Sequence, residues 1–132
     1  HNFYSFKTNE ENFISKIITS SLKNEKINLT QGKQIRDFIH IDDATNLIIS
    51  ILENITNFKS SDYNFNIGGN QPISIKKISN IIRRYYNGNI SLNLRNRKYT
   101  NKYQKINYYS DLNIISKITS WKPQNKLLEF FK

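Results

Sequence analysis

The stretch Gly32-Lys33-Gln34-Ile35-Arg36-Asp37-Phe38-Ile39-His40-Ile41-Asp42-Asp43 gives the strongest indication of the fold. Apolar and polar residues interchange from Ile35 to Ile41, which predicts an extended segment. Two aspartates then stand before an apolar-periodic segment, and this predicts a helix whose first N–H groups are accepted by Asp42 or Asp43. A lone arginine beside such a junction is well placed to hold a phosphate. We therefore expect a strand-to-helix junction in which Arg36 binds an anion.

Length and composition favour one domain over residues 1–132. No run of about 18 apolar residues predicts a transmembrane helix, and the first residues do not resemble a signal peptide. The chain has no cysteine, which excludes disulfides and thiolate metal sites. These features agree with a cytoplasmic protein. The first residue is His1 and not Met, which suggests a processed chain or a fragment.

The charge of the chain is uneven. Residues 1–66 hold 7 Lys or Arg and 8 Asp or Glu, whereas residues 67–132 hold 13 and 2, which gives −1 and +11. A basic half of this kind is compatible with a nucleic-acid-binding module over residues 76–105. Because the lysines are scattered in a sequence crowded with Asn and Ile, compositional drift is the more economical explanation.

Strands and helices alternate along the chain, which indicates an α/β unit. Predicted helices cover about 9–24, 43–56, 75–87, 111–118 and 125–131, with Thr8 and Glu11 as a capping box and Ser74 and Asp111 as further caps. Predicted strands cover 27–29, 63–67 and 90–94, after an extended segment near 2–8, and 95–107 read as a loop. In the second helix we expect a buried stripe of Leu47, Ile48, Ile51, Leu52 and Ile55. In the third helix we expect Ile75, Ile78, Ile81, Ile82 and Tyr85 to face inward.

No arrangement of residues predicts catalysis within the chain. His40 stands in an apolar run and is interpreted as structural, and no residues have useful metal-ligand spacing. Gly68-Gly69 belongs to a turn and matches neither phosphate-loop pattern. The pairs Tyr85-Tyr86 and Tyr108-Tyr109 are compatible with base stacking but are more typical of core or rim positions.

Four blocks taken together resemble a known family. They are G-K-Q-I-R-D-F-I-H-I-D-D, F-N-I-G-G-N-Q-P-I-S-I, S-D-L-N-I-I-S-K and W-K-P. Their order and spacing resemble the C-terminal half of the NAD-dependent nucleotide-sugar epimerases/dehydratases, which are extended short-chain dehydrogenase/reductases. The segment Asn2-Phe3-Tyr4-Ser5 resembles the family's N-x-Y-G, with Ser5 in place of the glycine.

The resemblance implies the C-terminal part of an extended Rossmann-type fold: the substrate-binding subdomain and the last strands of the sheet. It implies an oxidoreductase-type enzyme that binds a nucleoside-diphosphate sugar for surface polysaccharide and uses NAD or NADP held by an N-terminal half. The glycine-rich loop and the Tyr-x-x-x-Lys pair of that half do not occur in the sequence, and Tyr4 and Lys7 are one residue short of the spacing. We therefore expect this chain alone to be inactive.

The family's substrate-binding positions fall on six residues here. Asn2 matches an asparagine that reaches the substrate, and Asn12 with Phe13 matches a pair near the diphosphate. Leu29 and Thr30 match a segment along the nucleobase. Arg36 matches the arginine that pairs with the diphosphate. Asp43 matches a helix cap, and His40 matches a framework residue.

The sequence departs from the family where a second diphosphate arginine is expected. The best register places Asn101 there, with Gln104 in place of an acid, and Arg95, Arg97 and Lys102 are alternative substitutes. The choice between epimerase, dehydratase and reductase stays open, as do homodimer formation, NAD against NADP, and the identity of the sugar. A basic nucleic-acid-binding module and a non-functional truncated remnant are the other hypotheses.

Overall fold

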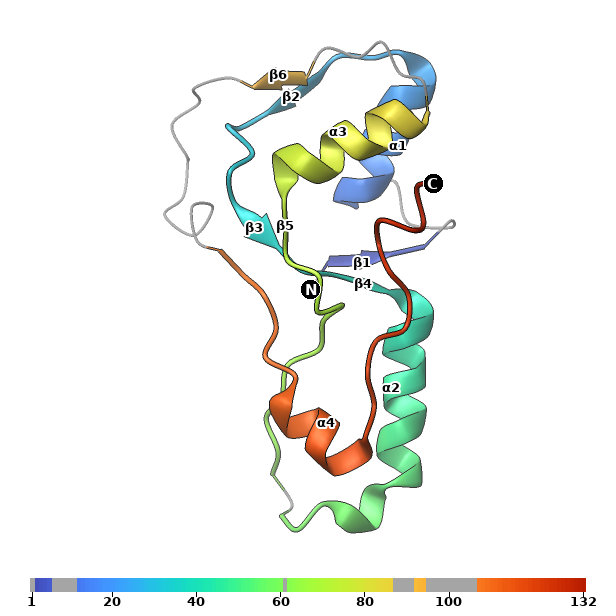
Figure 1. The fold of residues 1–132 in the computed structure, drawn as a ribbon, viewed down its shortest axis with the longest axis vertical. Coiled ribbons are helices and arrows are strands. Elements are labelled where there is room, and N and C mark those ends of the chain that lie inside the picture. The colour runs from blue at the N-terminus through green and yellow to red at the C-terminus, as the bar shows by residue number, and fades with distance from the viewer. Residues whose placement is uncertain (1, 6–11, 61, 87–91, 95–106) are drawn as a thin grey trace.

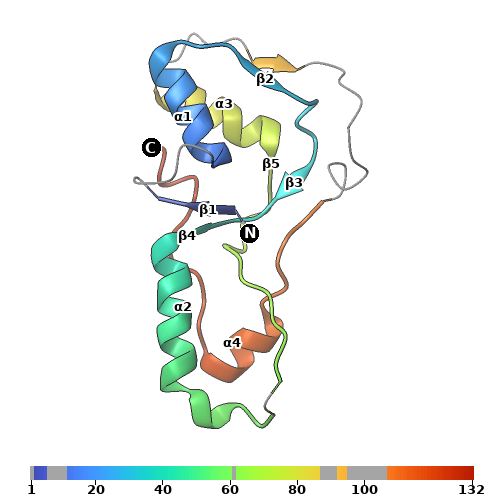
Figure 2. The same ribbon diagram turned by 180° about the vertical axis from the view of Figure 1, so that it is seen from behind.

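The computed structural model describes residues 2–5, 12–60, 62–86, 92–94 and 107–132, with only the backbone for 92–94. The molecule is elongated, with helices at its two ends, the β1–β4 pair between them and the β2–β6 pair at the same end as α1 and α3 (Figure 1). The view from behind shows α1 lying across α3 at one end, while α2 and α4 occupy the other (Figure 2). No helix of this described part is long and apolar enough to cross a membrane.

Six short strands form three pairs in the residues that the structure describes. Strand β1 (Asn2–Tyr4) runs parallel to β4 (Phe38–His40) with Phe3 opposite Ile39. Strand β2 (Ile27–Leu29) runs parallel to β6 (Leu92–Leu94). Strand β3 (Ile35–Arg36) is antiparallel to β5 (Ile73–Ser74). The chain is therefore α/β as predicted, although β3 and β4 pair with different strands on either side of Asp37.

Four α-helices and one short 3₁₀ turn accompany these strands in the described residues. They are α1 (Phe13–Lys23), α2 (Ile41–Glu53), η1 (Ile55–Asn57), α3 (Ile75–Tyr85) and α4 (Asn113–Thr119). Ser74 caps α3 as predicted, because its hydroxyl accepts the Lys77 N–H. The prediction of Asp111 as the cap of α4 is wrong by one residue, because Leu112 is the N-cap, although the Asp111 carboxylate accepts the Asn113 N–H at 2.9 Å.

Two other predicted helix starts are wrong. The first helix begins at Phe13, because the Asn12 side chain accepts the Ile14 N–H at 2.9 Å. The proposed capping box of Thr8 and Glu11 lies outside the described residues. The second helix begins at Ile41 and not near Asp43, with His40 as its N-cap.

Two apolar clusters hold the molecule together. The larger one joins α1, α3 and the β1–β4 pair, and its fully buried side chains include Tyr4, Ile14, Phe38, Ile78 and Leu127. The smaller one joins α2, α4 and the end of β4 through buried Ile39, Ala44, Leu47, Ile115 and Trp121. The β1–β4 pair therefore contributes to both clusters and connects the two ends.

The predicted apolar stripe of α2 is only partly buried. Leu47 is fully buried, but Ile48, Leu52 and Ile55 are 57%, 65% and 58% exposed. Tyr85 in α3 is exposed as well, against the prediction. Helix α2 is apolar around much of its circumference, so its apolar pattern does not define one face, and the side with Ala44 and Leu47 is the one that packs.

Two predicted elements do not form. Residues 63–67 are extended but pair with no strand in the described part of the chain, although the Ser110 hydroxyl donates to the Ile67 carbonyl at 2.7 Å. Residues 127–131 form turns and not a helix, and residues 125 and 126 have no regular structure. Distant side chains hold this last segment, because the Asn125 N–H donates to the Asp43 carboxylate and the Leu127 N–H donates to the Gln71 side-chain oxygen.

The carboxylate of Asp43 fixes that C-terminal segment. Asp43 is almost completely buried in the first turn of α2, and it accepts the Gln124 N–H at 3.0 Å and the Asn125 N–H at 2.9 Å. The Asn125 side-chain amide donates a third hydrogen bond at 2.9 Å. The prediction of Asp42 or Asp43 as the cap is wrong, because His40 Nδ1 accepts the Asp42 N–H at 3.2 Å. Asp43 instead connects α2 to Gln124 and Asn125, which lie 81 and 82 positions later in the sequence.

We predict that Asp43→Ala lowers the free energy of unfolding by about 3 kcal/mol, because it leaves buried N–H donors without an acceptor. Asp42→Ala is the matched control. Its side chain is 71% exposed, so the loss should stay below about 1 kcal/mol. Urea denaturation of both variants measures the difference. Equal losses would show that Asp43 has no special role.

Tyr4 lies at the same meeting point of strand and C-terminal segment. Its hydroxyl donates to the Asn125 carbonyl at 3.4 Å, and its ring packs edge-on against His40 and Phe130. Burial, and secondarily the Asp43 carboxylate, raise the pKa of Tyr4 well above its ordinary value. The folded chain therefore keeps this proton at a pH where the unfolded chain releases it near pH 10.

The sign of this linkage predicts a loss of stability in alkali. The contribution is fully present below about pH 10 and falls as the pH rises further, because only the unfolded state gives up the proton. The free energy of unfolding should drop less between about pH 9 and pH 11 in Tyr4→Phe than in the parent chain. Tyr109→Phe, at a ring that is 70% exposed, should keep the parent slope. The idea fails if the Tyr4→Phe slope is also unchanged.

Candidate anion site at Arg36

A hollow of about 250 Å³ lies beside Arg36. The residues that line it come from β1, β3 and two later segments, and they are Asn2, Arg36, Asp37, Asn66, Tyr108, Tyr109 and Ser110. Asn2 and Arg36 were both predicted as binding residues, and the fold brings them to one place. They meet because Asn2, in β1, pairs with Phe38, the first residue of β4, and Phe38 is only two residues after Arg36.

Two contacts orient the Arg36 side chain. Its Nη1 donates to the Ile35 carbonyl at 2.7 Å, and its Cζ lies 5.1 Å from the centre of the Tyr108 ring. The Tyr108 N–H in turn donates to the same Ile35 carbonyl at 3.1 Å. A guanidinium over an aromatic face is attracted by the ring's negative face. The half-buried Arg36 is therefore held by its own strand and by the segment that crosses it.

Asp37 holds the wall of the hollow in place. This buried carboxylate accepts the Gln71 N–H at 3.1 Å and the Ser110 N–H at 3.3 Å. A Cβ atom at Gly68 would overlap the Asp37 carboxylate and the Ser110 hydroxyl, so only glycine fits there. Asp37 is thus occupied by structural hydrogen bonds, although it stands next to Arg36.

Asn2 also has a structural contact, because its side-chain amide donates to the Asp37 carbonyl at 3.5 Å. The other four predicted binding residues do not line this hollow. Asn12 caps α1 and donates to the Phe3 carbonyl, and Phe13 stacks on Phe38. Leu29 packs against the larger core, and the Thr30 hydroxyl accepts the Gln34 side-chain amide.

The sequence analysis missed Asn66 and Ser110 and treated Tyr108 as a core or rim residue. Tyr108 is half exposed and lies 72 positions from Arg36, so no local pattern connects the two. The residues considered for the second diphosphate arginine (Asn101, Gln104, Arg95, Arg97 and Lys102) all lie outside the described part of the chain.

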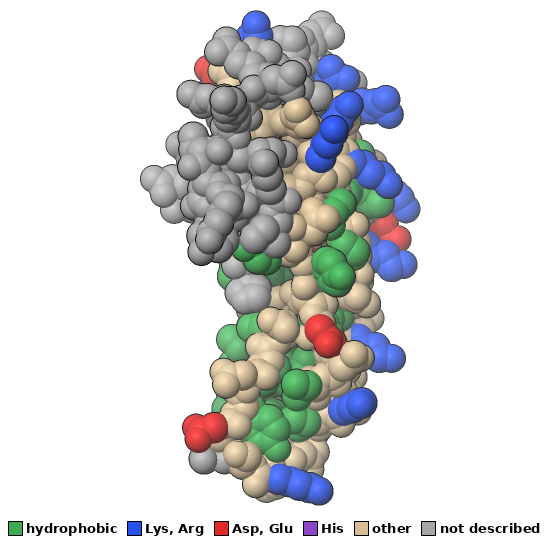
Figure 3. All heavy atoms as spheres, turned by 90° about the vertical axis from the view of Figure 1, so that its left-hand side faces the viewer, with side chains coloured by type: hydrophobic (Ala, Val, Ile, Leu, Met, Phe, Trp, Pro, Cys, Tyr) green, Lys and Arg blue, Asp and Glu red, His purple; other side chains and the backbone are tan. Residues whose placement is uncertain are grey.

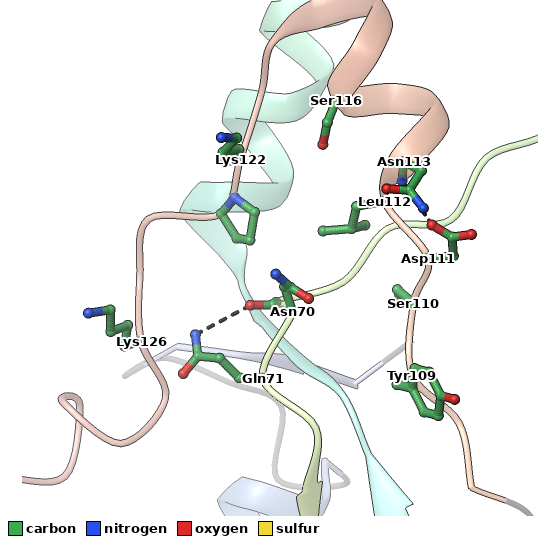
Figure 4. Close-up of a pocket in the computed structure, with 12 residues that line it drawn as sticks. Asn70, Gln71, Tyr109, Ser110, Asp111, Leu112, Asn113, Ser116, Lys122 and Lys126 are labelled. Carbon is green, nitrogen blue, oxygen red and sulfur yellow. Dashed lines mark hydrogen bonds between the residues drawn. The ribbon is translucent and has the colours of Figure 1, made fainter.

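A larger cleft of about 770 Å³ lies on the other side of the segment that carries Tyr109 and Ser110. Figure 4 shows Lys122 and Lys126 on one wall and the residues from Tyr109 to Asn113 on the other. Gln71 lies between these walls, where its amide donates to the Gly69 and Asn125 carbonyls. The Gln71 Oε1 atom accepts the Leu127 N–H at 3.0 Å.

His40 and the buried acidic side chains have structural contacts in the described residues. His40 caps α2 and contacts the rings of Tyr4 and Phe130, which agrees with its interpretation as a structural residue. No group of three or more His, Asp or Glu side chains in the described ranges is placed to hold a metal ion. The chemistry that the geometry supports is binding of an anion by an oriented guanidinium.

Comparison with known proteins gives a family. The model of the NAD dependent epimerase/dehydratase family matches residues 1–68, which include Asn2 and Arg36. CDP-abequose synthase of Salmonella muenchen is 30% identical over 77 residues, which cover 58% of this chain and 26% of that protein. The chain thus spans about a quarter of this relative.

Solved structures share the fold at lower identity. UDP-glucose 4-epimerase of Thermotoga maritima, solved with UDP-glucose, superposes with a TM-score of 0.81 at 17% identity, over 97% of this chain and 40% of that one. The dTDP-glucose 4,6-dehydratase of Streptomyces venezuelae, solved with NAD, gives 0.79 at 18% identity, over 97% and 38%. UDP-glucuronic acid 4-epimerase of Bacillus cereus gives 0.76 at 21% identity, over 97% and 39%. The chain spans about two fifths of each of these structures.

Proposed function

The chain belongs to the NAD dependent epimerase/dehydratase family, and we propose that it forms the nucleotide-sugar-binding part of such an enzyme, with Arg36 holding the diphosphate. The single observation that carries this proposal is the hollow in which an oriented guanidinium lies beside Asn2 and Asn66. Names of the relatives support the substrate class, since they act on CDP-, UDP- and dTDP-linked sugars.

The surroundings of Arg36 suit a diphosphate. A guanidinium offers five N–H donors in a planar fork that matches phosphate oxygens. The Tyr108 ring covers one face of that plane, so the fork keeps its direction before a ligand arrives. The amide of Asn66 lines the same hollow and adds a neutral polar group that is suited to phosphate, ribose or sugar.

The residues of this chain do not fit NAD. A dinucleotide pyrophosphate needs a glycine-rich turn between a strand and the N-terminus of a helix. Helix α2 follows β4 directly, but its first turn carries Asp42 and Asp43, whose charges oppose a pyrophosphate. Helix α3 follows β5, and its first three N–H groups already donate to Gln34, Gly32 and Ser74. We therefore place NAD or NADP and the catalytic Tyr-x-x-x-Lys pair on a unit outside these 132 residues.

Two features support the packing of a further α/β unit against this chain. Helix α2 exposes Ile48 and Leu52, and the following turn η1 exposes Ile55, which together give an apolar surface of the kind that usually marks a contact. Within the described residues β1 pairs only with β4, while parallel sheets normally have more strands and both faces covered. The other side of β4 is closed, because Gly69 lies directly against the Phe38 carbonyl. The open edge of the pair is therefore that of β1.

We predict that Arg36→Ala weakens binding of UDP, CDP or dTDP about 10- to 100-fold, as expected for loss of one charge-assisted contact. Calorimetric titration of the 132-residue chain with the three nucleotides measures this. Lys33→Ala is the control, because it removes the same charge from an exposed residue three positions away. Arg36→Lys should recover only part of the affinity, since a lysine cannot form a fork. Unchanged affinity in Arg36→Ala would remove Arg36 from the site.

A second prediction concerns the cofactor. The 132-residue chain should show no saturable heat of binding with NAD or NADP, because the first turn of α2 is acidic and no glycine-rich turn occurs in the sequence. The same calorimetric protocol with a nucleoside diphosphate serves as the positive comparison. Tight binding of NAD by this chain would contradict the division of roles that we propose.

A further inference from the structure

A second positively charged groove lies along α3 and begins at Ser74, which pairs with Ile35 next to Arg36. It has a volume of about 360 Å³ and is lined by Ser74, Lys76, Lys77, Asn80, Ile81 and Arg84. None of these residues lines either hollow described above. Lys and Arg side chains follow one long edge of the molecule in Figure 3, including the end that carries α3. The sequence analysis assigned this basic region no role in the epimerase hypothesis.

The helix presents these cations on a fixed surface. Lys77, Ile81 and Arg84 follow one another at helical spacing and share a face of α3. The opposite side of the helix is anchored, because Ile75, Ile78 and Ile82 are buried in the larger core. Lys76, Lys77 and Arg84 are exposed and form no ion pair with any acidic side chain of the described residues. An anchored helix therefore holds three cations that nothing in this part of the chain neutralises.

Two of the cations stand where they destabilise the helix. Lys76 and Lys77 occupy the first turn of α3, whose helix dipole favours negative charge, and no acidic residue is present in that turn. The backbone cannot attract an anion here in their place, because the Lys76 and Lys77 N–H groups already donate to Gly32 and Ser74. A bound anion at the side chains would relieve the unfavourable charge.

We propose that the α3 groove binds a compact anion made of linked phosphate groups. The helical rise places Lys77 and Arg84 about 10 Å apart along the axis. A chain of linked phosphates reaches both cations better than one phosphate does, and Asn80 and Ser74 add neutral donors along the same path. A membrane surface fits the groove less well, because the apolar side of α3 is buried in the core and has nothing to insert.

The experiment is a calorimetric titration with tripolyphosphate, in the Arg36→Ala background so that the first site does not contribute. We expect one saturable site, with orthophosphate at the same ionic strength binding at least about tenfold more weakly because it reaches fewer cations. Lys76→Glu combined with Lys77→Glu should weaken tripolyphosphate at least about tenfold, and added salt should weaken it in the parent chain. Circular dichroism checks that the variants are folded, and Arg84→Gln is a milder second variant at the far end of the groove.

Lys59→Glu combined with Lys122→Glu is the matched control, because both lysines are exposed and lie outside the groove. This control changes the net charge by as much as the Lys76→Glu and Lys77→Glu double variant does. It should leave the affinity for tripolyphosphate within about twofold of the value without these two substitutions. Equal loss in both double variants would overturn the proposal, since only net charge would then matter. Absence of tripolyphosphate binding would also overturn it. So would binding only of oligonucleotides with affinity that grows with length, which would identify a nucleic-acid surface instead.

Discussion

The structure depends on the buried carboxylate of Asp43. A charged group inside a protein is costly unless hydrogen bonds satisfy it, and Asp43 meets that requirement with three donors from Gln124 and Asn125. Because the carboxylate sits in the first turn of α2, it also lies at the favourable end of that helix. One residue therefore joins the helix to the end of the chain. Asp37, at the other end of β4, is a second buried carboxylate that hydrogen bonds satisfy, because it accepts the N–H groups of Gln71 and Ser110. The two carboxylates place the segments that form the walls of both hollows.

Local sequence patterns predicted the parts of the fold that local forces determine. The junction of β4 and α2, the cap at Ser74 and the α/β class are examples, because each depends on neighbouring residues. The cap at His40 was missed because Asp42 and Asp43 are the stronger cap formers, yet Asp43 is engaged by donors more than 80 positions away. The buried face of α2 was misjudged for a similar reason. Its apolar residues surround the helix, and only tertiary packing decides that Leu47 and not Leu52 lies inside.

The candidate site was predictable only where a sequence block carried it. Arg36 was identified from its own stretch, and the family resemblance added Asn2, which the fold then brings to the same hollow. Tyr108 and Asn66 carry no recognisable signal of their own. Tyr108 reaches Arg36 because the Ser110 N–H donates to Asp37 and the Tyr108 N–H donates to the Ile35 carbonyl. Asn66 follows because the Ser110 hydroxyl donates to the carbonyl of its neighbour Ile67. The site therefore consists of Arg36, whose guanidinium is suited to an anion, and of residues that hydrogen bonds between distant segments bring beside it.

The contact between Tyr4 and Asn125 has a consequence for how this chain folds. It joins residues 121 positions apart, and Leu127 and Phe131 complete the same cluster that contains β1. Tyr4 therefore reaches its full set of contacts only after Asn125, Leu127 and Phe131 are present. Contacts of such long sequence separation slow folding, because the loop entropy is lost before the contact forms. We therefore expect residues 125–131 to join the core late in folding, and a chain that lacked them would leave Tyr4 without these contacts.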